Sequence, residues 1–411
     1  TGSGRFPGTA GRVRAELTET LTMSTETTAP KPPLTVLGED DALFRDAIRE
    51  FAEGEITPRI AAMEKSGRYD DDLLPKLFEM GLMAVDVPEE YGGAGGTFFQ
   101  SILAVEEISR VDAAVGVLVD VQNTLFNNAI ARSGTDAQKA EYFPRIATDT
   151  VGAYALSEAA SGSDAFGLEC RAEQVAGGWK LDGSKMWITN AGEAGVFLLF
   201  ATIDPGLGYK GITAFLVERG DPGFTVGKRE SKLGIRASST CELILENCTI
   251  PEDRVLGEIG KGYKIAIETL NEGRIGIGAQ MVGVARAALE QSCRYAKERI
   301  QFGKPIAEFQ AVQHGLARMA TEIEASRLLV YNAARLRDAG LPFTKEAAMA
   351  KLATSETAER AASQAIETFG GYGYTTEYPV EKLYRDCKIG KIYEGTSFMQ
   401  LNTIAKLILS E

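Results

Sequence analysis

The sequence of 411 residues contains a single histidine, His314, and none of its five cysteines belongs to a Cys-x-x-Cys pair. One histidine excludes most histidine metal sites and most catalytic groups that pair histidine with serine or cysteine. The odd number of cysteines favours a reduced compartment with unpaired thiols over a disulfide framework. If the chain carries out proton chemistry, a carboxylate is therefore the expected base.

Acidic residues outnumber basic ones, 57 to 44, and long apolar runs are absent. A net charge of -13 and a pI near 4.9 argue against general binding to nucleic acid or anionic membranes, which requires a basic surface. No run approaches the ~18 apolar residues that span a bilayer. Hydrophobic content of 44% and charged content of 25% are typical of a soluble globular protein, and the length predicts two or three domains.

The first 33 residues are rich in glycine, threonine, serine and proline and lack apolar periodicity, which predicts disorder. Arg5, Arg12 and Arg14 precede the first acid, Glu16, and give this segment a weak likeness to a transit peptide. The alternative is that the native chain starts at Met23. We favour this alternative because the arginines are sparse and no amphipathic helix is predicted.

Three regimes of hydrophobic period follow and predict three domains: helical over 34–152, β over 153–262 and helical again over 263–411. In the first domain, apolar residues recur at helical spacing from Leu43 to Phe51, with Asp40 or Asp41 as the predicted N-cap. Further helices are predicted over 98–110 and 117–133.

The middle domain has a period of two. Asp182-Gly183 predicts a hairpin turn between two strands. No helix-length pattern separates the strands, so the sheet should be largely antiparallel, in a small barrel or sandwich. Further strands are predicted over 196–203, 212–217, 224–226 and 241–245. In the last domain, amphipathic runs over 263–300, 309–339 and 345–369 predict an antiparallel helix bundle.

Two glycine-containing segments of the middle domain are candidate ligand sites. Gly206-Leu207-Gly208-Tyr209-Lys210-Gly211 matches GxGxxG, but a strand rather than a helix is expected after it, which disfavours a Rossmann site. Its aromatic residue, Tyr209, remains a candidate ligand contact. The segment 155–164 combines small residues, hydroxyls and two acids, which suits either a flat polar ligand or a plain turn capped by Asp164.

Trp187 is one of two tryptophans and stands on a predicted strand that ends in Thr189. It is either a ring that lies against an aromatic cofactor or, more commonly, a core residue. Asn271-Glu272-Gly273-Arg274 is expected to interrupt a long helix, since a glycine inside a helix costs about 1 kcal/mol relative to alanine. Something is therefore expected to approach the chain there. Arg274 is either a ligand contact or a surface ion-pair partner.

Two helix ends in the last domain suit a phosphate-bearing ligand. The turn from Arg299 through Phe302-Gly303 to Gln310 is basic and aromatic, and a helix N-terminus beside an arginine can hold a pyrophosphate. The helix end at Glu367–Gly373 contains three glycines. An ordinary C-cap explains Gly370 but leaves Gly371 and Gly373 unexplained.

Near the end of the chain, Glu394 stands between apolar residues and a glycine, in Lys391-Ile392-Tyr393-Glu394-Gly395-Thr396-Ser397. Desolvation by Ile392 and Tyr393 would raise its pKa towards that of a working base. On this segment alone, the commoner alternative is a surface glutamate in a turn that precedes a helix.

Taken in order, these segments resemble the acyl-CoA dehydrogenase family from about residue 34 to the end. Each motif is weak alone, but the ordered set is specific: 155–164, Lys185–Thr189, Arg299–Gly303, Gly370–Gly373 and Ile392–Thr396. Residues 271–277 and 209–213 look most like the short/branched-chain branch, which oxidises 2-methylbutyryl-CoA and related thioesters.

The resemblance implies an α+β multi-domain fold with an N-terminal helical domain, a central antiparallel β-barrel domain and a C-terminal four-helix bundle. It implies FAD as cofactor, no metal, a homotetramer, and oxidation of an acyl-CoA to the trans-2-enoyl-CoA. Electron-transfer flavoprotein is the implied acceptor, and no nucleic acid or membrane partner is expected. The implied compartment is the cytoplasm of a bacterium, or the mitochondrial matrix if the chain is eukaryotic.

By resemblance, Glu394 is the base, and its backbone N–H helps to polarise the thioester carbonyl. Predicted cofactor contacts are Tyr154, Leu156, Ser157, Gly162, Ser163, Trp187, Ile188, Thr189, Arg299, Phe302, Gln310, Glu367, Gly370, Gly371, Thr396, Ser397 and Phe398. The contacts of Arg299 and Gln310 are expected across a subunit interface. Predicted substrate contacts are Ser163, Tyr209, Tyr263, Asn271, Glu272, Gly273, Arg274 and Lys406.

Two positions bear on this transfer from the family. Phe398 is a departure, because asparagine or glutamine is usual there, and a side-chain amide contact is lost. In some relatives the base sits at the position of Gly273, which here has no side chain and leaves room where a methyl branch of the substrate is hypothesised to fit.

Other functions stay open at this point. Butyryl-CoA and isobutyryl-CoA are alternative substrates. An acyl-CoA oxidase is a second enzyme class, disfavoured because the chain stops soon after Glu394. A helical assembly protein without catalysis is a third, and the presence of Glu394, Arg299 and Trp187 argues against it.

Overall fold

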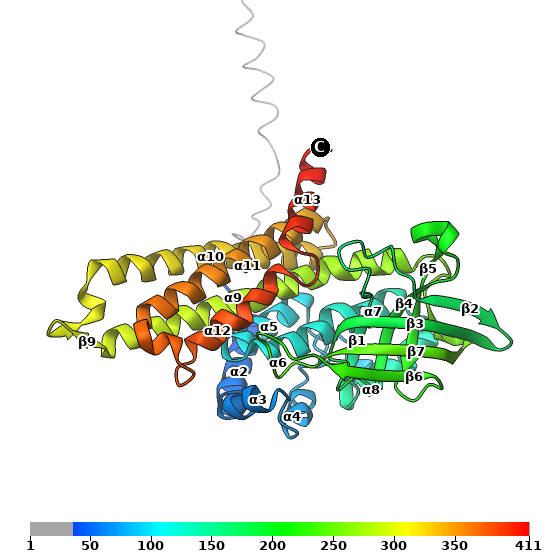
Figure 1. Ribbon diagram of the computed structural model, residues 1–411, viewed down its shortest axis with the longest axis horizontal. Helices are drawn as coiled ribbons and strands as arrows, with labels where there is room; N and C mark the ends of the chain where they lie inside the picture. The colour runs from blue at the N-terminus through cyan, green and yellow to red at the C-terminus, as the bar shows by residue number, and fades with distance from the viewer. Residues whose placement is uncertain (1–35, 411) are drawn as a thin grey trace, which may run out of the picture. The chain divides into compact units, whose positions relative to one another are not determined.

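The computed structural model describes residues 36–410. The predicted disorder of residues 1–33 and the predicted start at Met23 lie outside the described residues. From Gly38 onward the chain forms one compact unit. Figure 1 shows its elements coloured along the chain, with helices on either side of the β segment in sequence.

The N-terminal part is helical, as predicted. Its α-helices are α2 (Glu39–Phe51), α3 (Ile60–Ser66), α4 (Leu73–Glu79), α5 (Phe98–Val111), α6 (Ala113–Asp120), α7 (Asn128–Ser133) and α8 (Asp136–Thr148). The predicted cap at Asp40 or Asp41 is wrong: α2 begins at Glu39, so both acids lie in its first turn, and Gly38 is the N-cap. In α5, by contrast, Thr97 and Gln100 form a capping box at the N-terminus of the helix.

The prediction of one continuous helix over 117–133 is wrong for the residues in its middle. A π-helical segment, Val121–Asn127, joins α6 to α7. Polar side chains in this segment bond to the carbonyls of the preceding turn: Asn123 Nδ2 donates to Val119 at 2.9 Å, and Thr124 Oγ1 donates to Asp120 at 3.0 Å. Such bonds compete with the regular helix ladder, and π-bulges often mark functional sites.

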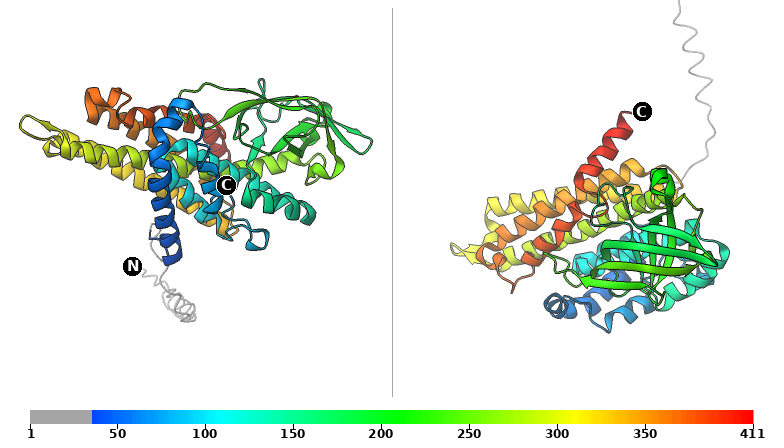
Figure 2. Two further views of the ribbon diagram at one scale, coloured as in Figure 1. Left: turned by 90° about the horizontal axis from the view of Figure 1, so that it is seen from below. Right: turned by 45° about the vertical axis from the view of Figure 1, so that its right-hand side comes forward.

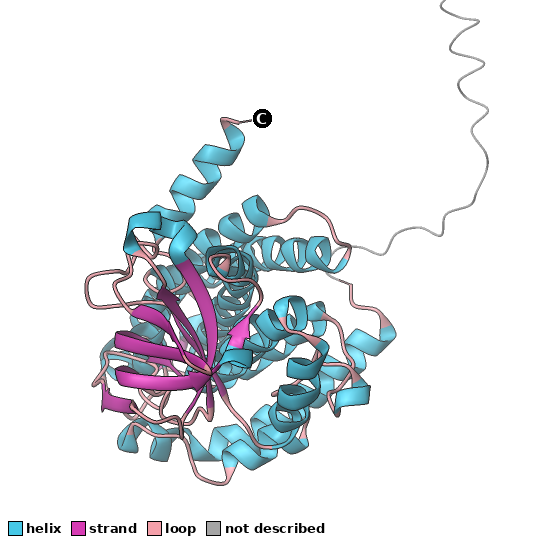
Figure 3. Ribbon diagram, turned by 90° about the vertical axis from the view of Figure 1, so that its right-hand side faces the viewer, coloured by secondary structure: helices cyan, strands magenta, loops and turns pink. Residues whose placement is uncertain are grey.

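The middle part folds into one eight-stranded sheet of order β6-β7-β3-β2-β4-β5-β8, with β1 paired to β4. The strands are β1 (Gly152–Ala155), β2 (Arg171–Val175), β3 (Gly178–Thr189), β4 (Val196–Thr202), β5 (Ile212–Glu218), β6 (Phe224–Arg229), β7 (Thr240–Pro251) and β8 (Val255–Leu256). Most pairs are antiparallel, as predicted, but β4 runs parallel to β1 and β2. Within the described residues the end strands β6 and β8 are not paired, so the predicted barrel closure is not confirmed. Figure 3 shows the strands gathered beside the helices.

The hairpin predicted at Asp182-Gly183 is wrong, because both residues lie inside the continuous strand β3. The register against β7 shifts at this point. Gly183 has φ +140°, and a Cβ there would lie 2.9 Å from the Cα of Cys170. The Asp182 carboxylate accepts a bond of 2.6 Å from the Asn247 amide of β7. The dipeptide therefore forms a β-bulge with close backbone approach rather than a turn.

The C-terminal part is dominated by α9 (Gly262–Glu298), α10 (Gln310–Asp338) and α11 (Thr344–Phe369), followed by α12 (Val380–Cys387) and α13 (Ser397–Ile408). A short hairpin of β9 (Ile300–Gln301) and β10 (Lys304–Pro305) joins α9 to α10. The three long helices pack on one another, and α9 also packs on α5 (Figure 2). No described helix is long and apolar enough to cross a membrane.

The interruption of α9 expected at Asn271–Arg274 is wrong, because the helix continues through these residues. Packing on three neighbouring helices outweighs the weak intrinsic preference of one glycine. What Gly273 provides is space on the helix surface.

Candidate active site

Glu394 lies in a tight turn directly before α13. It has φ +50°, which is rare for a residue with a side chain, and Gly395 follows with φ +87°. Side chains hold the carbonyls of this turn. Gln400 Nε2 donates to Glu394 O at 3.2 Å and to Gly395 O at 2.9 Å, and Lys351 Nζ donates to Gly395 O at 2.6 Å. These bonds offset the strain of the left-handed conformation. Thr396 accepts from the Met399 amide and caps α13.

The carboxylate of Glu394 is directed at α9. A Cβ built on Gly273 would lie 2.0 Å from Glu394 Oε2 and 2.7 Å from Leu125 Cδ2. Oε2 is buried and accepts no hydrogen bond from the described residues. Burial raises the pKa of Glu394 to about 7, while the charges of Lys351 and Arg274 act in the opposite direction. A base is most effective when its pKa lies near the working pH, so this carboxylate suits proton abstraction.

A second buried carboxylate, which the sequence analysis missed, lies near the first. Asp120 is fully buried at the end of α6, and its Oδ1 accepts a bond of 2.9 Å from Thr124. A Cβ on Gly276 would lie 1.7 Å from this Oδ1 atom. Residues three apart are neighbours on a helix surface, so Gly273 and Gly276 receive the two carboxylates on one face of α9. Burial and the charge of Glu394 raise the pKa of Asp120 well above its ordinary range.

Trp187 lies on the sheet with its side chain 58% exposed and φ +65°. The register of β3 against β7 shifts between Lys185 and Ile188, so Trp187 occupies a bulge. The core alternative for Trp187 is therefore wrong; the buried tryptophan is Trp179, at 3%. An exposed aromatic ring in a strained bulge is a candidate ligand contact.

The segment after β1 lies against the same part of β3. Lys185 is fully buried and donates to Glu158 Oε1 at 2.7 Å and to Leu156 O at 3.1 Å. Ser157 O accepts from the Met186 amide at 2.9 Å. These bonds hold the segment against the strand that carries Trp187. A Cβ on Gly162 would meet nothing within 4 Å, which leaves that backbone open to a ligand.

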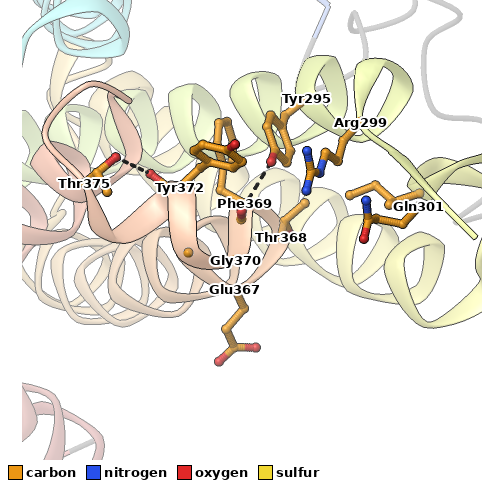
Figure 4. Close-up of a pocket in the computed structure, with 11 residues that line it drawn as sticks. Tyr295, Arg299, Gln301, Glu367, Thr368, Phe369, Gly370, Tyr372 and Thr375 are labelled. Atoms are coloured by element: carbon orange, nitrogen blue, oxygen red, sulfur yellow. Dashed lines mark hydrogen bonds between the residues drawn. The ribbon is translucent and has the colours of Figure 1, made fainter.

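A third group of predicted residues lines a pocket of about 540 Å³ at the far end of α9 (Figure 4). The lining residues are Tyr295, Arg299, Gln301, Ile306, Glu367, Thr368, Phe369, Gly370, Gly371, Tyr372 and Thr375. The Arg299 guanidinium lies 5.3 Å from the centroid of the Tyr372 ring. Figure 4 shows the carboxylate of Glu367 directed away from Arg299, which leaves this cation open to an anion.

The three glycines near this pocket are required for different structural reasons. Gly370 has φ +63°, and a Cβ on Gly371 would meet nothing within 4 Å, so both leave the backbone open towards the pocket. Gly373 is explained by internal packing, because its Cβ would lie 2.6 Å from Ile366 O. Phe302, 94% exposed, and Gln310, also exposed, lie near this end without lining the pocket.

One chain does not bring this pocket together with Trp187 and Glu394. The 37 residues of α9 span about 55 Å at 1.5 Å per residue. Its first residue, Gly262, packs on the backbone of β5, whereas Arg299 follows its last residue. Figure 1 shows the β9–β10 hairpin and the sheet at opposite ends of this helix.

Several predicted substrate contacts lie along the first half of α9. The rings of Tyr209 and Tyr263 pack at 4.9 Å. Arg274 donates to Asn271 Oδ1 at 2.7 Å. Glu272 accepts bonds from Arg132 and Arg337 at Oε1, whereas its Oε2 is buried without a partner among the described residues.

The remaining predicted contacts lie on or beside α13 and the sheet. Lys406, Phe398 and Ser163 are exposed, and Ile188 is buried. Tyr154 packs against Phe200, and its hydroxyl is buried without a partner among the described residues. Thr189 pairs with Thr240 in the sheet, and Ser397 has a buried hydroxyl without a described partner.

Comparison with known proteins covers nearly the whole unit. Models of the acyl-CoA dehydrogenase family match at residues 38–150 (N-terminal domain), 153–248 (middle domain) and 260–409 (C-terminal domain). A probable short/branched chain specific acyl-CoA dehydrogenase of Dictyostelium discoideum is 53% identical over 92% of each chain. Butyryl-CoA dehydrogenase from Megasphaera elsdenii superposes with a TM-score of 0.89 at 41% identity, covering 91% of this chain and 99% of that one.

A chain from the structure of the electron transferring flavoprotein of Acidaminococcus fermentans superposes with a TM-score of 0.90. It is 42% identical to this chain, and the match covers 92% of this chain and 100% of that one.

Proposed function

Because this chain belongs to the acyl-CoA dehydrogenase family and is a FAD enzyme, we propose that it dehydrogenates short or branched acyl-CoA thioesters with Glu394 as the base. The observation that carries this proposal is the buried environment of the Glu394 carboxylate. Its Oε2 atom is buried, accepts no hydrogen bond from the described residues, and belongs to a carboxyl group whose pKa is raised to about 7.

The chain's own residues divide the reaction as follows. Ionised Glu394 accepts the α-proton at Oε2, and the electron pair of the broken C–H bond enters the new α,β double bond. FAD, when bound, supplies the acceptor for the β-hydrogen and its two electrons. The turn fixes the backbone at Glu394, with φ +50°. The Glu394 N–H would donate to the thioester carbonyl and stabilise its developing negative charge.

The two groups of predicted FAD residues support a cofactor site built by two subunits. The segment at 154–163 and Trp187–Thr189 would hold the flavin ring beside Glu394. The pocket at Arg299 and Gly370-Gly371 would hold the phosphate and adenine side of FAD. In one chain the two groups lie near opposite ends of α9, so we infer that a second copy supplies one of them. We therefore propose a homotetramer in which Arg299 and Gln310 serve the FAD of a neighbour.

Exposed apolar residues on and beside α13 are available for such contacts. They are Ile392, Phe398, Leu401, Ile408 and Leu409. The acceptor of the electrons is proposed to be electron-transfer flavoprotein. The enzyme would act in the cytoplasm of a bacterium or, for a eukaryotic source, in the mitochondrial matrix.

The test is anaerobic bleaching of the purified, FAD-loaded protein by a panel of linear and branched acyl-CoAs. We expect loss of the flavin's visible absorbance with 2-methylbutyryl-CoA, isobutyryl-CoA or butyryl-CoA, with the first fastest. A preference for acyl chains of eight carbons or more would overturn the substrate assignment. A Glu394→Gln variant should bind FAD and not bleach; normal bleaching by this variant would overturn the base assignment.

A further inference from the structure

Lys351 is a buried cation beside the proposed base. It lies on α11 with a relative exposure of 0%, and its Nζ donates to Gly395 O at 2.6 Å. Lysine is almost never fully buried unless it is paired. None of the residues that the structure describes gives Nζ a carboxylate at ion-pair distance, although Glu394 belongs to the turn that Lys351 holds. A charge in this setting needs a functional or structural reason.

The surroundings of Lys351 connect it to Glu394 electrostatically. Burial lowers the pKa of Lys351 to about 8, with the Glu394 charge raising it and the Arg274 charge lowering it. In return, the charges of Lys351 and Arg274 both lower the pKa of Glu394, and Lys351 has the larger effect. Arg274 is also bonded to Asn271, whereas Lys351 contacts the turn of the base directly.

We propose that Lys351 is a positioning residue for proton abstraction: its charge keeps Glu394 ionised, and its bond to the Gly395 carbonyl holds Glu394 in the left-handed turn. This inference rests on the proposed function of Glu394. The two effects are separable, because Gln400 also donates to the Gly395 carbonyl and preserves part of the hold when Lys351 is replaced.

The other groups that face Glu394 do not replace this charge. Asp120, from α6, is another carboxyl group, and Tyr393 is a buried phenol whose pKa is raised by burial and by the charges of Asp120 and Glu394. Arg274, from α9, is the only other cation acting on Glu394 among the described residues. Removing the Lys351 charge should therefore raise the pKa of Glu394, because an adjacent opposite charge favours the ionised form.

The experiment measures the rate of anaerobic flavin bleaching by a saturating reactive acyl-CoA against pH, for wild type and three variants. Lys351→Gln keeps a hydrogen-bond donor and removes the charge. The acid limb of its pH–rate profile, where the rate falls as Glu394 is protonated, should therefore move up by about one pH unit or more. At pH 7 the ionised fraction of Glu394 would fall from about half to about one tenth, which predicts an approximately fivefold loss of rate that high pH restores. Lys351→Met removes donor and charge, so its rate should also stay low at high pH. Lys351→Arg should keep the wild-type acid limb.

The matched control is Lys228→Gln, which removes the same charge from an exposed lysine on the edge strand β6 and should leave the profile unchanged. Thermal unfolding and FAD content are measured for every variant. An unmoved acid limb in Lys351→Gln would overturn the inference while wild type still bleaches and the proposed function stands. An acid limb in Lys351→Arg that lies about one pH unit above that of wild type would also overturn it. This comparison with wild type needs only the Lys351→Arg variant to fold. A wild type that no acyl-CoA bleaches would overturn the proposed function as well.

Discussion

The Oε2 atom of Glu394 lies 2.0 Å from the place where a Cβ on Gly273 would be. Real Cβ atoms do not approach other atoms so closely, so the absence of a side chain at 273 is what allows the carboxylate its present seat. Leu125 closes the same space from the π-helical segment, at 2.7 Å. The helix, the turn before α13 and the N-terminal helices therefore meet at this one glycine.

Gly273→Ala should displace the carboxylate of Glu394. Since a shift of about 1 Å at a reacting group can cost on the order of 100-fold in rate, we expect a loss of kcat of that order with FAD content retained. Flavin bleaching under anaerobic conditions measures the loss.

The control for this variant is Gly315→Ala in α10, whose Cβ would meet only the flexible end of Gln364 at 3.2 Å. It should leave the bleaching rate unchanged. A Gly273→Ala enzyme of normal kcat would contradict the seating of Glu394 described above. Because this variant moves the base, the hypothesis that Gly273 makes room for a methyl branch is better tested by comparing acyl-CoAs on the wild-type enzyme.

Glu394→Gln should stabilise the protein at neutral and higher pH. The folded state holds this carboxyl with a pKa near 7, against an ordinary value of 4.5. Between these values the folded state binds more protons than the unfolded state, so wild-type stability falls as pH rises through this range. At about 1.4 kcal/mol per pH unit, the upper bound above pH 7 is on the order of 3 kcal/mol.

Thermal unfolding of wild type and Glu394→Gln at several pH values measures this difference. The variant should have the higher Tm at pH 8, and the two curves should converge as the pH approaches 4.5. Equal Tm values at pH 8 would show that Glu394 has an ordinary pKa in the folded enzyme.

Gly371→Leu should weaken FAD retention without unfolding the chain. A Cβ at 371 would meet nothing within 4 Å, and a longer side chain is expected to extend into the pocket that Arg299 lines. Gly220→Leu is the matched control, since it also meets nothing within 4 Å but lies on the loop between β5 and β6. FAD released by denaturation, relative to protein, is the readout. Full FAD content in Gly371→Leu would remove this pocket from the cofactor site.

The long elements were predictable from sequence because their hydrophobic periods extend over many residues. The helices α9, α10 and α11 begin and end within two residues of the runs predicted from 263, 309 and 345. Glu394 was predictable as a candidate base because the chain offers so few alternatives, and its burial and raised pKa support this proposal. The sequence left two alternatives for Trp187, a core residue or a ligand contact. The bulge in β3 exposes its side chain, which the sequence alone could not show.

What sequence could not provide depends on contacts between distant segments. Asp182-Gly183 has the composition of a turn, but the bond to Asn247 and the approach of Cys170 make it a bulge. Asp120 and Lys351 come from helices far apart in sequence and meet Glu394 only in the folded unit. The glycines at 273 and 276, one turn apart on a long helix, were the available signal for two approaching side chains.

Asp120→Asn should be well tolerated, unlike a comparable change at another buried aspartate. Burial and the Glu394 charge raise the pKa of Asp120 well above its ordinary 3.8, so its carboxyl keeps its proton to a higher pH in the folded state than in the unfolded state. Where the folded state binds more protons than the unfolded state, stability falls as pH rises. The uncharged amide avoids this cost, so the variant should be more stable than wild type at pH 7 and should converge with it near pH 4.

Asp112→Asn is the contrasting variant, because Asp112 caps α6 through two amides and pairs with Lys382 at 2.9 Å. Its loss should destabilise the fold by about 1–3 kcal/mol, measured by chemical denaturation at pH 7. The pH profile of flavin bleaching separates the two possible states of Asp120. If Asp120 is neutral, its replacement leaves the acid limb of Glu394 in place, since no charge has been removed. An acid limb that falls by a pH unit or more would mean that Asp120 is ionised, and that two adjacent carboxylates share the face of α9 formed by Gly273 and Gly276.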